Sequence, residues 1–140
     1  MDLTADEVKT LRWAWARVRS LQDQAGELMY RRFFELAPDA AALFGREVAI
    51  HGRTFMAAMS GIIDVIDRQD RLTGVLRRLA HAHAGVGVKG GHYAAMGDAL
   101  VWMLREEIGP AFTAEDEALW REMWVQLLDD MIAATEIARG

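Results

Sequence analysis

The chain has 140 residues, a formal net charge of −5 at pH 7 and no cysteine. This length is sufficient for one domain with a buried core and one small bound group. An acidic balance without a basic stripe argues against nucleic acid as the main partner, because phosphate binding needs clustered lysine and arginine. The lack of cysteine excludes disulfides, thiolate nucleophiles and attachment of a cofactor through a thioether.

The first residues and the longest apolar stretches indicate where in the cell the protein is expected to be. Polar residues follow Met1 at once, so no signal peptide is visible. Every apolar stretch is interrupted by charges well before it reaches the length of a membrane span. We therefore expect a cytoplasmic protein with no membrane span.

Helix signals recur along the chain, whereas the alternation typical of strands is absent. Thr4 and Glu7 match a capping box, in which each side chain satisfies a free backbone N–H at a helix start. A second helix is expected from about Asp23 to Ala37, and a short helical turn from Pro38 to Phe44. The first helix should bury a seam of Val8, Leu11, Trp15 and Val18.

Further helices fill the second half of the chain. One is expected to begin near Arg46, and the next ends before glycines at 85, 87, 90 and 91, where the chain can turn freely. A fifth long helix should run from about His92 to Ile108, and Thr113 with Asp116 offers a capping pair for the last. The last helix should carry inward Leu119 or Trp120, Met123 or Trp124, Leu127 or Leu128, Met131 and Ile132. These elements predict one all-α domain of about six long helices over residues 1–140.

Two of the four histidines fall on apolar helix faces. His83 continues a stripe of leucines, whereas His81 points about 200° away from it, toward the polar face. His51 continues the apolar stripe of the preceding helix, and His92 at a helix start is expected to be exposed. The two stripes contain Leu72, Leu76, Leu79 and Val86 beside His83, and Phe55, Met59, Ile62 and Ile66 beside His51.

Two interpretations of the inward histidines remain open. His51 and His83 are either core histidines paired with backbone groups, because an unpaired buried imidazole costs a few kcal/mol, or they face each other across an apolar slot. The second arrangement suits a planar iron macrocycle, which takes one axial ligand and a neighbour to the opposite coordination position. Zinc is less suitable, because it normally requires three or four protein ligands.

Glycine is placed where the two helices that bear Tyr30 and His51 would cross. Gly26 precedes Tyr30 by four residues, and Gly52 follows His51. Two positions without side chains would allow a close crossing, which offsets the cost of about 1 kcal/mol for each glycine in a helix. We expect this crossing to bring the Tyr30 hydroxyl near His51.

Two further polar residues have alternative interpretations. Tyr93 begins the fifth long helix, and Glu136 follows Ile132 by four residues on the expected inner face of the last helix. A carboxylate in that position needs a donor. The alternatives are that Tyr30 and Tyr93 are ordinary core aromatics, and that Glu136 belongs to a frayed helix end in solvent.

Two segments resemble the single-domain bacterial globins of the flavohaemoglobin and Vitreoscilla-type haemoglobin lineage. LAHAHAGVGV at 79–88, followed by HYAAMG at 92–97, is similar to the family's proximal stretch. MYRRFFELAP at 29–38, with Leu43 and Phe44, resembles its tyrosine-bearing helix and the corner phenylalanine. The resemblance covers essentially the whole chain. It implies the globin fold, a three-over-three helical sandwich without a D helix.

The resemblance also implies roles for individual residues. His83 matches the proximal iron ligand of a non-covalent haem b, and His51 the distal position, where it is a candidate second iron ligand. Tyr93 and Glu136 match the residues that hydrogen-bond near the other nitrogen of the proximal imidazole and make it more basic. Tyr30 matches the distal tyrosine that donates to bound O₂ and slows its release.

The same resemblance implies further contacts with the cofactor, and it also shows where the chain departs from the family's pattern. Phe44 matches the phenylalanine that stacks on haem, and other contacts are expected from Phe55, Leu79, Val88, Tyr93 and Met96. His51 stands where the lineage often has glutamine, which raises the prospect of iron held by two histidines. Phe55 is bulkier than the usual aliphatic residue and would narrow the pocket, and Ala82 replaces a basic partner of a haem propionate.

The implied function is reversible binding of O₂, NO or CO, which supports NO dioxygenation when electrons are supplied. The sequence shows no flavin and nicotinamide reductase domain, so we expect a separate reductase as partner. The protein is expected to be a monomer or a homodimer. The alternatives are an O₂ or redox sensor or carrier without turnover, a bis-histidyl electron-transfer globin, and a haem-free helical interaction module with the same fold.

Overall fold

The computed structural model describes residues 1–45, 47–83 and 90–139, apart from the side chains of Gln22, Phe44 and residues 135–139. Within these ranges it contains helices and no strand. The α-helices are α1 (Ala5–Arg19), α2 (Gln22–Leu36), α3 (Pro38–Phe44), α4 (Val48–Val65), α5 (Gln69–His83), α6 (Gly90–Ile108) and α7 (Ala114–Arg139), and a 3-10 turn spans Gly109–Ala111. The all-α prediction is confirmed, including the short helix that begins at Pro38.

The expected capping pairs form at the starts of two helices. Glu7 N–H donates to Thr4 Oγ1 at 3.1 Å, and Thr4 N–H donates to Glu7 Oε1 at 2.9 Å. Asp116 N–H donates to Thr113 Oγ1 at 3.1 Å, and Thr113 N–H donates to Asp116 Oδ2 at 3.0 Å. Each pair satisfies two backbone donors that the helix itself leaves free, so the local sequence defines where α1 and α7 begin.

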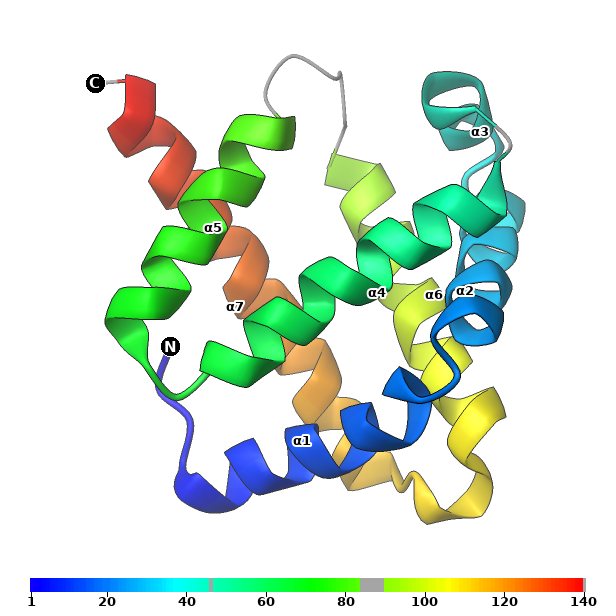
Figure 1. The fold of residues 1–140 in the computed structure, drawn as a ribbon, viewed down its shortest axis with the longest axis horizontal. Coiled ribbons are helices and arrows are strands. Elements are labelled where there is room, and N and C mark those ends of the chain that lie inside the picture. The colour runs from blue at the N-terminus through cyan, green and yellow to red at the C-terminus, as the bar shows by residue number, and fades with distance from the viewer. Residues whose placement is uncertain (46, 84–89, 140) are drawn as a thin grey trace.

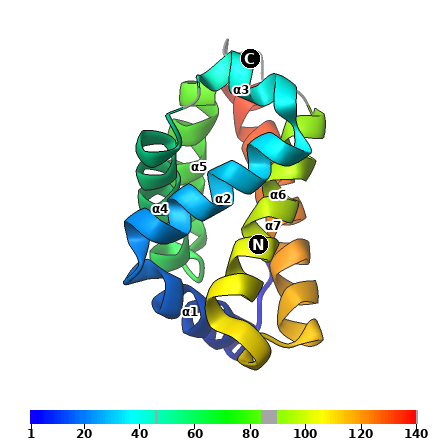
Figure 2. The ribbon, with the colours of Figure 1, turned by 90° about the vertical axis from the view of Figure 1, so that its right-hand side faces the viewer.

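The helices form two layers, with α4 and α5 in one and α6 and α7 in the other (Figure 2). The most extensive packing joins α2 to α4 and α6, and α5 to α7. Helix α1 lies across one end of the molecule, while the last turn of α5 and the first turn of α6 lie at the opposite end (Figure 1). In the described part of the chain, no helix is both long enough and apolar enough to cross a membrane.

The buried seams follow the expected spacing with one correction on α7. All four seam residues of α1 are buried, and Trp15 Nε1 also donates to Ser60 Oγ at 2.9 Å. Ile132 was expected to face inward but is 51% exposed. The buried face of α7 instead follows Trp120, Met123, Leu127 and Ala134. Steps of three and four residues along this face lead past Met131 to Ala134, which turns Ile132 outward.

Helices α2 and α4 cross at Gly26 and Gly52, as expected. A Cβ atom built on Gly26 would lie 2.6 Å from the carbonyl carbon and oxygen of Gly52, and one on Gly52 would lie 2.5 Å from the Gly26 carbonyl carbon. These neighbours are backbone atoms, which cannot move aside without shifting a whole helix. The absence of two side chains therefore determines how closely α2 approaches α4.

Gly26→Ala should lower the free energy of unfolding by about 3 kcal/mol, at the upper end of what overpacking usually costs. Denaturant unfolding measures this change. Gly61→Ala is the matched control on α4, because a Cβ there meets nothing within 4 Å. It should raise the same free energy by about 0.5–1 kcal/mol, since alanine restricts the unfolded chain. Equal effects of the two substitutions would show that the crossing tolerates a methyl group.

Candidate functional site

Two adjoining cavities lie between the helix layers. The first cavity has a volume of about 100 Å³ and the second about 90 Å³. Four residues line both, namely Phe55, His83, Tyr93 and Trp124. The first cavity is completed by Tyr30, Phe33, His92 and Met96. The second is completed by Ala58, Met59, Ile62, Leu76, Leu79, Leu127, Leu128 and Met131. Tyr30 and His92 thus add polar groups to the first cavity, while the residues that line only the second are all apolar.

His83 occupies the last residue of α5 and borders both cavities. Its ring Nδ1 lies 2.7 Å from the Leu79 carbonyl oxygen, one turn earlier in the helix. A carbonyl oxygen only accepts, so the proton of a neutral ring is on Nδ1 and the lone pair is on Nε2. That tautomer is the one in which Nε2 can ligate a metal. His81 is exposed, as the helix spacing predicted.

Tyr30 lies in an aromatic cluster made by α2 and α4. Its ring centroid is 5.6 Å from that of His51 in a stacked arrangement, and 6.3 Å from that of Phe55 edge to face. The glycine crossing accounts for this closeness, because Tyr30 is one turn from Gly26 and His51 is adjacent to Gly52. His51 is therefore near Tyr30, as expected, although Tyr30 and not His51 lines the first cavity.

Burial controls the ionisation of both tyrosines. Desolvation raises the pKa of Tyr30 to about 12, because a phenolate in these surroundings loses its hydration. The same cause raises the pKa of Tyr93, whose ring centroid is 6.3 Å from that of His83. Both phenols are therefore neutral near pH 7 and keep a proton to donate.

His92 was expected to be exposed, but only 6% of it is. Its Nε2 lies 2.8 Å from Asp39 Oδ2, so the first turn of α6 is joined to α3. The reason is that α6 begins at Gly90, ahead of the expected start, which places His92 within the helix and against its neighbours. His92 is also part of the first cavity wall, a position the sequence did not predict.

Trp124 is a second residue of the cavity wall whose inward orientation the sequence did not determine. Spacing on α7 allowed either Met123 or Trp124 to face inward, and both do so in part, since Met123 is buried in the core and Trp124 lines the cavities. Its Nε1 donates to the Tyr93 carbonyl at 3.0 Å, and its ring lies 6.3 Å from that of Phe55.

Some of the residues that were expected to contact the cofactor line the two cavities. Met96 lines the first cavity, Leu79 the second and Phe55 both. Val88 and the side chains of Phe44 and Glu136 lie outside the described residues. Their roles remain predictions.

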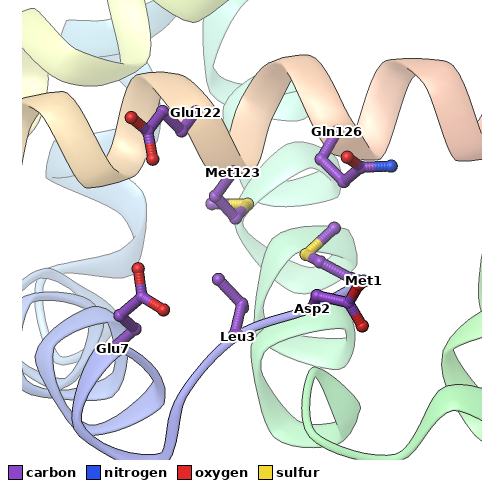
Figure 3. A pocket seen from close by; sticks show the side chains of 7 residues that line it. All are labelled: Met1, Asp2, Leu3, Glu7, Glu122, Met123 and Gln126. Atoms are coloured by element: carbon purple, nitrogen blue, oxygen red, sulfur yellow. The ribbon is translucent and has the colours of Figure 1, made fainter.

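A third and larger hollow lies between the N-terminal segment and α7, with a volume of about 240 Å³. Figure 3 shows Glu7 and Glu122 on opposite walls, and Leu3 facing Met123 beside them. Glu7 already accepts a hydrogen bond from Thr4 N–H. The seven residues that line this hollow include no histidine, so the cavities beside His83 are the candidate site.

Comparison with known proteins gives a consistent result. The globin family model matches residues 27–131. Globin polymeric component P3 of Glycera dibranchiata is 27% identical over 150 residues, covering 97% of this chain and 99% of that protein. A neuroglobin of Tetraodon nigroviridis is 24% identical over 143 residues, covering 92% and 90%. A flavohemoprotein of Bordetella pertussis is 31% identical over 137 residues, which are 93% of this chain and 33% of that protein.

Solved structures confirm the fold. The haemoglobin of the botfly Gasterophilus intestinalis superimposes with a TM-score of 0.85 at 15% identity, covering 96% of this chain and 99% of that one. A hexacoordinated heme protein from an anhydrobiotic tardigrade gives a TM-score of 0.84 at 20% identity, covering 96% of each chain. At these identities the similarity concerns the fold, which is the globin fold that the sequence predicted.

The raised pKa of Tyr30 predicts a loss of stability in alkali. Between the ordinary tyrosine pKa of 10.0 and about 12, the unfolded chain releases the phenolic proton while the folded protein keeps it. The free energy of unfolding should therefore fall as the pH rises through this window. A Tyr93→Phe variant, in which Tyr30 is the only tyrosine left, allows phenolate absorbance to follow Tyr30 alone. Ionisation near pH 10 in the folded protein would contradict the prediction.

Proposed function

Because the chain belongs to the globin family, we propose that it binds haem at the two cavities, with His83 as the proximal iron ligand, and takes up O₂ and other diatomic gases reversibly. The family match spans Tyr30, Phe55, His83 and Tyr93, the residues that the fold brings together. The tardigrade protein of the same fold is described as a heme protein. Haem b is the form we expect, since the sequence has no cysteine for a thioether link.

The observation that carries this proposal is the hydrogen bond from His83 Nδ1 to the Leu79 carbonyl. Metal-bound histidines nearly always donate their other ring N–H to a carbonyl or carboxylate, which fixes the ring and raises its basicity. The bond leaves Nε2 as the ligating atom on a residue that borders both cavities. One imidazole in an apolar slot is a donor set that fits haem iron.

The lining of the two cavities combines apolar side chains with one imidazole. Apolar side chains such as Leu79, Met96 and Phe55 would exclude water from a bound haem. When bound, haem supplies an iron atom that coordinates one diatomic gas molecule reversibly. The chain's own contribution is to hold one side of the iron with His83 and to present polar groups on the other.

Tyr30 is the group best suited to interact with a gas ligand. It lines the first cavity, and burial raises its pKa to about 12, so it keeps its proton into the alkaline range as well. A phenolic O–H can donate to the partial negative charge that a coordinated gas develops. The His51 ring stacks on that of Tyr30.

The finer assignment within the family is to the single-domain bacterial globins related to flavohaemoglobin, in the cytoplasm. It is supported by the 31% identity to the Bordetella pertussis flavohemoprotein, of which this chain spans a third. In that case the reaction is NO + O₂ + e⁻ → NO₃⁻, with the electron supplied by a separate reductase. Consumption of NO with a supplied reductase tests this assignment. Gas binding without NO consumption would instead indicate a carrier or sensor.

A second candidate is electron transfer by iron held between His83 and His51. The stacking of His51 on Tyr30 favours it, because it places an imidazole beside the first cavity, and a hexacoordinated heme protein shares the fold. Absorption spectra of the ferric and ferrous protein distinguish the two candidates. A low-spin ferrous spectrum that becomes high-spin in His51→Ala would support the second; a high-spin wild-type spectrum would exclude it.

The ligand assignment makes a direct prediction. His83→Ala should abolish stable haem retention, seen as loss of the Soret band after reconstitution, because the variant lacks the imidazole assigned to the iron. His81→Ala is the matched control, two residues earlier and exposed, and should leave the spectrum unchanged. Loss of the band in His81→Ala alone would reverse the assignment, and a wild-type protein without the band would overturn the proposal.

The distal assignment predicts a change in gas release. Tyr30→Phe should speed O₂ dissociation about tenfold, which corresponds to one hydrogen bond of about 1.4 kcal/mol. Displacement of O₂ by CO in a stopped-flow instrument measures the rate. Tyr93→Phe, which removes the phenolic oxygen beside His83, is the control and should have a smaller effect. An unchanged rate in Tyr30→Phe would show that its hydroxyl does not contact the gas.

A further inference from the structure

Trp124 connects α7 to the first turn of α6 by a hydrogen bond. Its indole Nε1 donates to the backbone carbonyl of Tyr93 at 3.0 Å. Among the five tryptophans of the chain, it is the one that borders both cavities. Its ring also lies 6.3 Å from that of Phe55, so the indole spans from α4 to α6 along the cavity wall.

Gly97 provides the space that the indole occupies. A Cβ atom at Gly97 would lie 2.6 Å from both Cδ1 and Nε1 of Trp124. Both atoms belong to a rigid ring, so a methyl group at position 97 would have to displace the donor itself. Gly97 lies one turn after Tyr93 on α6, and glycine inside a helix costs about 1 kcal/mol relative to alanine. The lack of a side chain at Gly97 therefore allows the indole of Trp124 to reach the Tyr93 carbonyl.

The backbone that Trp124 holds carries the ring next to the proposed iron ligand. The Tyr93 ring lies 6.3 Å from the His83 ring, and both residues border both cavities. A shift of the first turn of α6 would move the Tyr93 ring relative to His83.

We propose that Trp124 is a positioning residue: with the space left by Gly97, its indole N–H holds the Tyr93 backbone so that the Tyr93 ring remains against His83. The placement of Tyr93 is a property of the protein alone. Its effect on the bound cofactor rests on the proposed function. The two parts are tested separately.

Trp124→Phe is the informative variant, because it keeps an aromatic ring in the wall and removes the N–H. Trp120→Phe is the matched control one turn earlier on α7. Trp120 is fully buried, and its Nε1 has no hydrogen-bond partner in the described part of the chain. The control therefore loses the same atoms from a tryptophan without losing a hydrogen bond to α6.

The placement of Tyr93 is tested on the haem-free protein with fluorotyrosine and fluorine NMR, since the chain has two tyrosines. Trp124→Phe should shift the Tyr93 resonance more than that of Tyr30, and Trp120→Phe should shift neither. Gly97→Ala should shift the Tyr93 resonance as well, and the double variant should add little to either single change. An unmoved Tyr93 resonance in Trp124→Phe, or an equal shift in Trp120→Phe, would overturn the proposal.

The effect on the cofactor is tested by the rate at which haem leaves for an excess of a haem acceptor. Trp124→Phe should lose haem about tenfold faster, the lower end of the effect of removing an outer partner of a metal ligand. A Tyr93→Ala background, which lacks the ring, should reduce this difference. A wild-type protein that takes up no haem would refute the proposed function, and the fluorine spectra alone would then decide the inference. Haem loss at the wild-type rate in Trp124→Phe would refute the effect on the cofactor and leave the proposed function intact.

Discussion

Where α2 crosses α4, two glycines bring the backbones so close that neither position has room for a methyl group. Almost everything on the Tyr30 side of the first cavity follows from this contact. Tyr30 and His51 belong to different helices, and their rings stack because each is within one turn of the crossing. A larger separation would also loosen the Tyr30–Phe55 contact and with it the wall shared by both cavities. The opposite side depends on α5, α6 and α7, where a third glycine, Gly97, leaves room for Trp124.

The sequence correctly predicted the structural features that depend on residues close to one another along the chain. Capping at Thr4 and Thr113, the seam of α1 and the opposite orientations of His81 and His83 all depend on spacing within one helix. The Gly26–Gly52 crossing was also predictable, because glycine inside two long helices is costly without a close approach to offset the loss. Such features need no knowledge of how distant elements pack.

The remaining features depend on contacts between distant segments. Nothing near His92 in the sequence indicates Asp39, 53 residues earlier, as its partner, and a helix boundary two residues off was enough to make a buried ring look exposed. The prediction that Ile132 faces inward was wrong for a related reason, because a small error in the expected helical phase accumulates along a helix of 26 residues. Trp124 could have been noticed through Gly97, yet two residues on separate helices become a pair only when α6 and α7 are packed together.

The burial of Tyr30 has a consequence for how the cavity responds to acidity. A phenol with a pKa near 12 has the same protonation state in a neutral cell, in an acidified one and in a mildly alkaline one. Its capacity to donate is thus constant over the range in which proteins usually work. Imidazoles change charge within that range. A change in the cavity with physiological pH would therefore have to come from groups other than the Tyr30 phenol, which would serve as an acid-insensitive reference for such a response.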